Sequence, residues 1–345
     1  MPLLSYQQAG LVLKRPGTGS DAQIRDLQRH LRVLGYLRQG IDGAFGGGTE
    51  GAVKSLQHDL LHNDGRGSDG RASVGVRDYN KGRCDAVTGE VDQNMAACIA
   101  DMLDDDGFAK LPATADPVAA NREIPALYAS LRPGTAPGPF LLAILSRESN
   151  LKHFHEPGRN DEDTYIVIGL DRNGAESHVV TSRGYGVGQY TLFHHPPRAE
   201  EVADFMTDVG RNLQKAADEL REKFDHFVNG STGGTRADDR IAEHGTVPLR
   251  PCKYGADDPR FMTDCKACAQ DAGQSDIKQG ETPFHPDTTS AYKSTQYYNY
   301  DRLDFSGVPV RKNFECDWPY AVRRYNGSGP NAYSYQALVL KKLLG

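Results

Sequence analysis

The sequence predicts a mainly α-helical protein of two domains, with a small antiparallel β-hairpin in the second domain. Apolar residues recur at steps of three and four along several segments, which is the spacing of amphipathic helices. Two β-rich runs, 164–170 and 177–181, flank an Asn-Gly pair that is typical of a tight hairpin turn. At ~150 residues per domain, a chain of 345 residues is long enough for about two domains.

The first hundred residues predict three helices. The first apolar stripe runs from Ile24 to Leu34, and Gly35 ends it. The second stripe runs from Val53 to Leu61, with Thr49 as the expected N-cap. A third stripe covers 91–103. We therefore expect a helical domain at 1–105, followed by a Pro- and Ala-rich linker at 106–138.

The second domain, expected at 139–345, begins with a helix directly after Pro139. After the hairpin, a long apolar stripe runs from Val202 to Phe227 and predicts one long helix, or two with a break near Gly210. Residues 229–313 show no sustained period and are expected to form an irregular insertion that contains cysteines. Two helical patterns, around residue 321 and over 335–344, close the chain.

Composition and charge exclude several classes of protein. The net charge of −6, from 40 basic and 46 acidic residues, is not that of a generally basic nucleic-acid binder. The longest apolar runs, 95–100 and 140–145, have six residues, whereas a membrane-spanning helix needs about 20. The glycine-rich turn near residue 186 lacks the Lys-Ser/Thr pair of a nucleotide-binding loop. We expect no nucleic acid, no membrane span and no cofactor.

The N-terminal helices carry an ordered set of short motifs: Leu27-Gln28, Leu34-Gly35-Tyr36, Asp42-Gly43-Ala44-Phe45-Gly46, Thr49-Glu50-Gly51-Ala52-Val53 and Leu56-Gln57. This order resembles the three-helix peptidoglycan-binding domain of cell-wall hydrolases. The resemblance implies that the partner is the glycan strand of peptidoglycan. It points to Tyr36, Asp42 and Phe45, because tight glycine-containing loops present backbone groups and aromatic side chains to ligands. The alternative is that these residues only build a helical hairpin.

Glu148 is the candidate catalytic residue of the second domain. It follows Ile144 by four residues and Leu145 by three, so it continues the apolar stripe of its own helix. Partial desolvation there is expected to raise the pKa of the carboxyl group and to keep it protonated near neutral pH. Glycoside cleavage needs such a general acid. The alternative is a solvated or capping glutamate at a helix end.

Two further segments accompany Glu148-Ser149: Gly186-Val187-Gly188-Gln189-Tyr190 and Tyr325-Asn326-Gly327-Ser328-Gly329. In this order they resemble the soluble lytic transglycosylases and goose-type lysozymes of the lysozyme-like superfamily. The resemblance implies an α+β lysozyme-like domain that cleaves the bond between N-acetylmuramic acid and N-acetylglucosamine. It makes Glu148 the acid and then the base, and has Tyr325 orient its carboxyl group. It assigns substrate contacts to Ser149, Gly186, Gly188, Gln189, Tyr190 and Asn326.

Whether a second carboxylate takes part in the reaction would decide whether the product is a hydrolysed or a 1,6-anhydro sugar. Inverting hydrolases use two carboxyl groups about 6.5–9.5 Å apart. The transglycosylases that this chain resembles use a single Glu, and the sugar's own 6-hydroxyl closes a 1,6-anhydro ring. The candidates for a second acid are Asp161, Glu162, Asp163 and Asp171, which are also ordinary residues for solvated loops.

The chain has six cysteines, of which Cys252, Cys265 and Cys268 follow a C-x12-C-x2-C pattern, with Cys316 further along. Disulfides are the favoured interpretation and zinc is the alternative, although the second C-x2-C pair of a common zinc site is missing. Cys84 and Cys98 are close enough in sequence to form a local pair.

The function indicated by these motifs is a muramidase, either a lytic transglycosylase or a lysozyme. The alternatives are a non-catalytic wall-binding component of a phage tail or secretion spike, and a chitinase-like glycosidase. The first residues lack the basic and apolar regions of a secretory signal. We therefore expect a protein made in the cytoplasm and delivered to the periplasm or wall, as a phage endolysin or an injected antibacterial effector. The further expected partner is an immunity protein or a delivery-spike protein.

Overall fold

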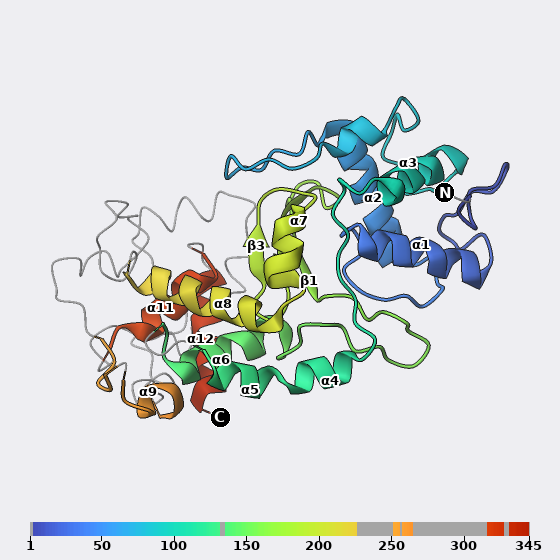
Figure 1. The fold of residues 1–345 in the computed structure, drawn as a ribbon. Helices are drawn as coiled ribbons and strands as arrows, with labels where there is room; N and C mark the ends of the chain where they lie inside the picture. Colours follow the sequence, from blue (N-terminus) through green and yellow to red (C-terminus); the bar gives the residue numbers. More distant parts are fainter. Residues whose placement is uncertain are drawn as a thin grey trace, which may run out of the picture. The chain divides into compact units, whose positions relative to one another are not determined.

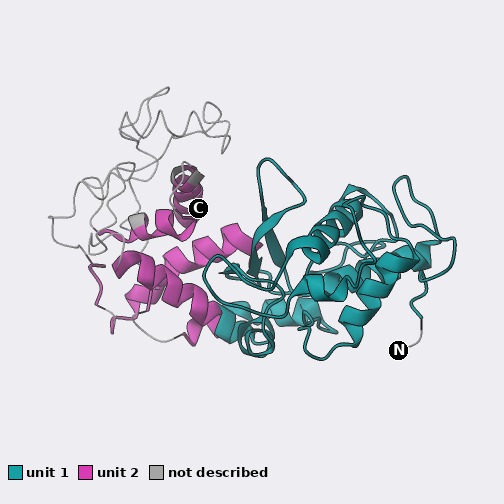
Figure 2. Cartoon of the chain, turned by 90° about the horizontal axis from the view of Figure 1, so that it is seen from above, with its two compact units in different colours: residues 1–125, 152–212 teal, residues 126–151, 213–345 magenta. Residues whose placement is uncertain are grey.

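The computed structural model describes residues 3–131, 135–225, 251–255, 257–264, 316–327 and 331–344. The chain forms two compact units, which Figure 2 distinguishes by colour. Unit 1 comprises 1–125 and 152–212, and unit 2 comprises 126–151 and 213–345. Residues 152–212, which we expected in the second domain, thus group with the N-terminal helices.

Three helices of unit 1 occupy the predicted positions: α1 (Asp21–Val33), α2 (Gly47–His62) and α3 (Gln93–Asp104) (Figure 1). A 3₁₀ turn, η1 (Val76–Tyr79), precedes α3. The predicted N-cap of α2 is wrong. Helix α2 starts two residues before Thr49 and has Gly46 as its N-cap, so the Thr49 hydroxyl instead accepts a hydrogen bond from Gln28 Nε2 at 3.1 Å. The apolar faces of these helices form one core around Leu27, Leu31, Val53, Leu56 and Ile99.

The sheet of unit 1 is antiparallel and has the order β1-β2-β3, with strands β1 (Ile168–Arg172), β2 (Val180–Tyr185) and β3 (Tyr190–Leu192). A hairpin is therefore present where the sequence predicts one, but the prediction of a tight Asn-Gly turn is wrong. Residues 173–179 form a longer loop, closed by a hydrogen bond from Asn173 N to Val179 O at 2.9 Å. The Asn173 side chain accepts from Ala175 N at 2.8 Å, and neither Asn173 nor Gly174 has a positive φ. The asparagine stabilises the loop through its side chain rather than its backbone conformation.

The predicted linker contains two short helices, α4 (Pro117–Arg122) and α5 (Ile124–Ala129). The long apolar stripe after the sheet is divided into α7 (Ala199–Glu201), a π-helical turn η2 (Val202–Met206) and α8 (Val209–Lys223). The break falls next to the expected position at Gly210. Phe227, the last residue of the predicted stripe, lies outside the described residues.

Unit 2 contains α6 (Gly138–Ser149), α9 (Arg260–Thr263), α11 (Trp318–Tyr325) and α12 (Asn331–Leu344). Helix α6 begins after Pro137, close to the predicted start, and packs against α11 and α12 (Figure 1). Gln336 connects α12 to α11, because its amide donates to Pro319 O at 2.6 Å and accepts from Arg323 Nε at 2.8 Å. Most of the predicted insertion at 229–313 lies outside the described residues.

The described chain is mainly helical with one small sheet, as the sequence predicts. None of its helices is both long enough and apolar enough to cross a membrane.

Candidate functional site

Glu148 lies in the last turn of α6 and is half-buried. The preceding residues Phe140, Leu141, Ile144 and Leu145 are buried, so the helix that carries the carboxyl group is anchored by its apolar face. After the helix, Asn150 and Leu151 both have positive φ, at 55° and 60°. Left-handed residues end a helix abruptly, and they are costly for a side chain such as leucine. Glu148 is thus held immediately before a sharp reversal of the chain.

A tyrosine that the sequence did not single out contacts Glu148. Tyr335 of α12 donates a hydrogen bond from its hydroxyl group to Glu148 Oε1 at 2.5 Å. Its side chain is buried, with an exposed fraction of 7% for the residue. Burial is the main cause that raises the pKa of Tyr335 well above the ordinary tyrosine value, and the Glu148 carboxylate adds to the effect. Tyr335 therefore keeps its proton and acts as a hydrogen-bond donor to the carboxyl group.

Tyr325, which the sequence assigned to this role, lies at the end of α11 and is half-buried. It is close enough to Tyr335 for its charge to raise the pKa of Tyr335, whereas Arg147 acts in the opposite direction. Glu148 and Tyr325 thus both lie close to Tyr335. Asn326 follows as the exposed C-cap of α11. Ser149 donates its hydroxyl group to Leu145 O at 3.1 Å, within its own helix.

The glycine-rich turn 186–189 belongs to unit 1 and connects β2 to β3. Gly186 has a φ of 72°, and a Cβ at this position would collide with the His153 ring and the Asn212 amide. Gln189 has a φ of 51°, and its side-chain amide donates to Gly186 O at 2.7 Å. In this conformation the Gln189 amide closes the turn itself. Tyr190 is half-buried and packs its ring edge-on against Phe205, with centroids 5.0 Å apart.

Two buried side chains outside the predicted motifs hold this turn. Asn212 accepts a hydrogen bond from Gly188 N at 2.8 Å and donates to Tyr185 O at 3.0 Å and Phe205 O at 3.1 Å. His153 Nδ1 accepts from Val187 N at 3.3 Å, so its proton lies on Nε2, which donates to Met206 O at 2.9 Å.

Burial lowers the pKa of His153 to about 4, so the ring is neutral at neutral pH. The sequence gave no signal for His153, which lies between Lys152 and Phe154 in a polar stretch.

All four candidates for a second acid have structural contacts in unit 1. Asp163 is fully buried and pairs with Arg32 Nε at 2.9 Å. Asp161 Oδ1 accepts from Ile41 N at 2.7 Å and from Asp163 N at 3.0 Å, while its Oδ2 lies 3.1 Å from His155 Nε2. Asp171 accepts from the Ser182 hydroxyl at 2.6 Å. The exposed Glu162 pairs with Arg25 and Arg29.

One further acid in unit 2 has an unusual environment. Glu219 of α8 is half-buried, and burial raises its pKa above the ordinary value, although Lys223 lies 3.4 Å away and counteracts this. The sequence gave no reason to separate Glu219 from the other charged residues of that helix.

The residues assigned to wall binding divide into two groups. Tyr36 and Phe45 are buried, with exposed fractions of 1% and 4%, and Tyr36 donates its hydroxyl group to Asp59 at 2.9 Å. Asp42 is exposed, and its Oδ1 accepts from Ala44 N and Gln28 Nε2. The two aromatic rings are thus part of the core, and Asp42 with the backbone around it is what this loop presents to solvent.

The cysteines that the structure describes give no metal cluster. Cys84 and Cys98 are free thiols rather than a local disulfide, and burial raises the pKa of both. Cys252 and Cys316 are buried, and Cys265 and Cys268 lie outside the described residues. Within the described ranges, no three His, Cys, Asp or Glu side chains are arranged to hold a metal ion.

Comparison with known proteins supports one part of the chain. Residues 20–60 match the family model of the putative peptidoglycan binding domain. These residues cover α1, the loop around Asp42 and nearly all of α2. Searches of curated proteins and of solved structures find no match to the chain. The chain therefore carries a peptidoglycan-binding domain, which makes peptidoglycan its supported partner.

Proposed function

We propose that this protein is a peptidoglycan-cleaving muramidase in which Glu148 is the general acid and then the base. The observation that carries the proposal is the hydrogen bond from Tyr335 to Glu148 Oε1, together with the peptidoglycan-binding domain at 20–60. A carboxyl group that is half-buried and oriented by a buried donor has the features of a positioned catalytic acid. A solvated glutamate at a helix end would lack such a partner.

The contact with Tyr335 suggests how the carboxyl group works. Glu148 would protonate the glycosidic oxygen of N-acetylmuramic acid as the bond to C1 breaks. The resulting carboxylate would then remove a proton from the attacking hydroxyl group. A hydrogen bond to the ionised form stabilises this carboxylate, which helps the first transfer.

We favour the lytic transglycosylase reaction, in which the attacking group is the sugar's own 6-hydroxyl. Asp163 is fully buried in an ion pair, and both oxygens of Asp161 have partners, so neither is poised to activate a water molecule. These contacts support chemistry with a single carboxyl group. Glu162 and Asp171, which are exposed, are the remaining candidates for a hydrolase.

The test compares purified wall sacculi treated with the wild type, Glu148→Gln and Glu219→Gln. Both substitutions remove one half-buried carboxylate from unit 2, but only Glu148 contacts Tyr335. We expect Glu148→Gln to abolish the release of soluble muropeptides and Glu219→Gln to retain it. Mass spectrometry of the products should show 1,6-anhydro ends.

Equal release by Glu148→Gln and the wild type would refute the assignment. Binding of sacculi without any release would favour the second candidate function, a non-catalytic wall-binding component, for which the family match at 20–60 is the supporting observation. Cleavage of chitin oligomers at the same rate as peptidoglycan would point to a chitinase-like enzyme.

A further inference from the structure

One face of the peptidoglycan-binding helices is covered by the protein's own chain. Arg32 of α1 pairs with Asp163, and both side chains are fully buried. Asp59 of α2 lies 3.4 Å from Arg183 of β2, and these two side chains are also buried. In each pair, one partner comes from the helices that match the family model and the other from residues 152–212. This face is therefore unavailable to a glycan strand.

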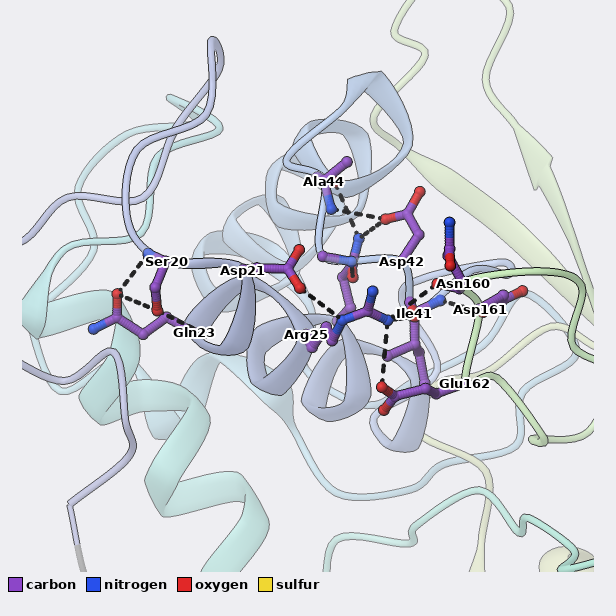
Figure 3. Close-up of polar contacts among 12 residues, drawn as sticks. Ser20, Asp21, Gln23, Arg25, Ile41, Asp42, Ala44, Asn160, Asp161 and Glu162 are labelled. Carbon is purple, nitrogen blue, oxygen red and sulfur yellow. Dashed lines mark hydrogen bonds and ion pairs between the residues drawn. The ribbon is translucent and has the colours of Figure 1, made fainter.

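A second contact joins the loop around Asp42 to residues 158–162 and leaves the edge that they form exposed. The loop that contains Asp42 meets the turn 158–162, which lies outside the family match. Ile41 N donates to Asp161 Oδ1 at 2.7 Å, and Glu162 N donates to Ile41 O at 3.1 Å. The Arg25 guanidinium donates to Ile41 O at 2.7 Å and to Asn160 O at 3.1 Å (Figure 3). Loop and turn are thus joined through the Ile41 backbone, which bonds to the Asp161 side chain and the Glu162 backbone.

From this junction we propose that the wall-binding surface is composite: the turn 158–162 binds peptidoglycan together with the loop 42–44. Asp42, Ala44, Gly158, Asn160 and Glu162 are all exposed. In Figure 3 the Asn160 amide points to the same side as the Asp42 carboxylate. The contacts that hold Asn160 use its backbone oxygen, so its side chain remains available for a ligand.

The chemistry of this edge selects the kind of ligand. It presents the Asn160 amide, the carboxylates of Asp42 and Glu162 and the guanidinium group of Arg29, whereas the nearby ring of Phe45 is buried. Such a surface recognises its ligand by hydrogen bonds and charge rather than by stacking. Peptidoglycan offers hydroxyl and acetamido groups on its sugars and both signs of charge on its stem peptides. A neutral polymer without stem peptides would form hydrogen bonds and ion pairs with fewer of the side chains at this edge.

The experiment measures binding of the full chain to intact sacculi by pelleting. Glu148→Gln serves as the background, so that binding is read without cleavage. Asn160→Ala removes one amide, and Gly158→Leu adds bulk beside it. Gly174→Leu, in the β1–β2 loop, is the matched control, because a Cβ at Gly158 or Gly174 would meet nothing within 4 Å. Ala44→Leu adds similar bulk to the loop inside the family match.

We expect Asn160→Ala to weaken binding about fivefold, which corresponds to a hydrogen bond worth about 1 kcal/mol. Gly158→Leu and Ala44→Leu should weaken binding at least as much, and Gly174→Leu should bind like the background protein. If Asn160→Ala and Gly158→Leu bind normally, the surface is not composite and the proposal is wrong. A background protein that does not pellet at all would also overturn it. Muropeptide release by the wild type is measured separately, so failure of the proposed muramidase activity is distinguishable from failure here.

Discussion

The buried ion pair between Arg32 and Asp163 leads to a prediction about stability that does not depend on function. Asp163 Oδ1 accepts from Arg32 Nε at 2.9 Å and from Tyr165 N at 3.1 Å, and Oδ2 accepts from Gly40 N at 2.9 Å. Both carboxylate oxygens therefore face N–H donors. In Asp163→Asn, the new amide nitrogen has to face one of these donors in either orientation. The substitution also leaves the Arg32 guanidinium buried without its counter-charge.

Breaking a buried ion pair by removing one partner costs about 3–5 kcal/mol. In a protein of marginal stability this is a large part of the total free energy of unfolding. For a unit of this size, 1 kcal/mol shifts the melting temperature by about 2–4 °C, so Asp163→Asn should lower it by about 6–20 °C.

Glu162→Gln is the matched control for Asp163→Asn. It makes the same change at the neighbouring residue, whose side chain is 48% exposed in its ion pairs with Arg25 and Arg29. Exposed ion pairs contribute at most about 1 kcal/mol, so the control should melt within a few degrees of the wild type. Thermal melts followed by circular dichroism provide the comparison. Equal shifts for the two variants would refute the argument from burial.

Three further predictions concern the candidate site and the turn 186–189. Tyr335→Phe removes the hydrogen-bond donor that favours the ionised form of Glu148, so the pKa of Glu148 should rise. The basic limb of the pH–rate profile should then move up by about one pH unit, which corresponds to an interaction of about 1.4 kcal/mol. An unchanged profile would contradict this role of Tyr335. Burial lowers the pKa of His153 from 6.5 to about 4, so below pH 6.5 the unfolded chain binds a proton that the folded chain does not. The free energy of unfolding, measured by urea titration, should therefore fall by about 2 kcal/mol between pH 7 and pH 5. A free energy of unfolding that does not change over this range would exclude a neutral buried ring. Asn212→Ala removes three buried hydrogen bonds at the turn 186–189. Since each such bond contributes about 1 kcal/mol, the melting temperature should fall by several degrees. A melting temperature equal to that of the wild type would show that the turn does not depend on these bonds.

The helices could be predicted because their signals are local. The apolar stripe of α1 and Pro139 at the start of α6 lie within the helices themselves. The hairpin shows the limit of such signals. The Asn-Gly pair correctly indicated a reversal of the chain, but the Asn173 side chain bonded to the backbone and produced a longer loop.

The contacts that join distant segments could not be predicted in the same way. Arg32 and Asp163 are 131 residues apart, and each looks in the sequence like one of many surface charges. Only burial distinguishes them from Arg29 and Glu162, which have the same chemistry and remain exposed. A charge pattern does not show which charged side chain becomes buried, because that depends on how residues 163–166 pack against α1.

The tyrosine beside Glu148 shows the same limit within the candidate site. The motif around residue 325 led us to expect Tyr325 as the partner of the carboxyl group, whereas Tyr335 on the next helix makes the hydrogen bond. Tyr325 lies close enough to Tyr335 to raise its pKa, but the hydrogen bond to the carboxyl group comes from Tyr335. The choice is made by the packing of α12 against α6, which places residue 335 opposite the end of α6. A variant series at Glu148, Tyr325 and Tyr335 therefore tests the geometry rather than the motif: if Tyr325→Phe shifted the pH–rate profile and Tyr335→Phe did not, the motif would be the better guide.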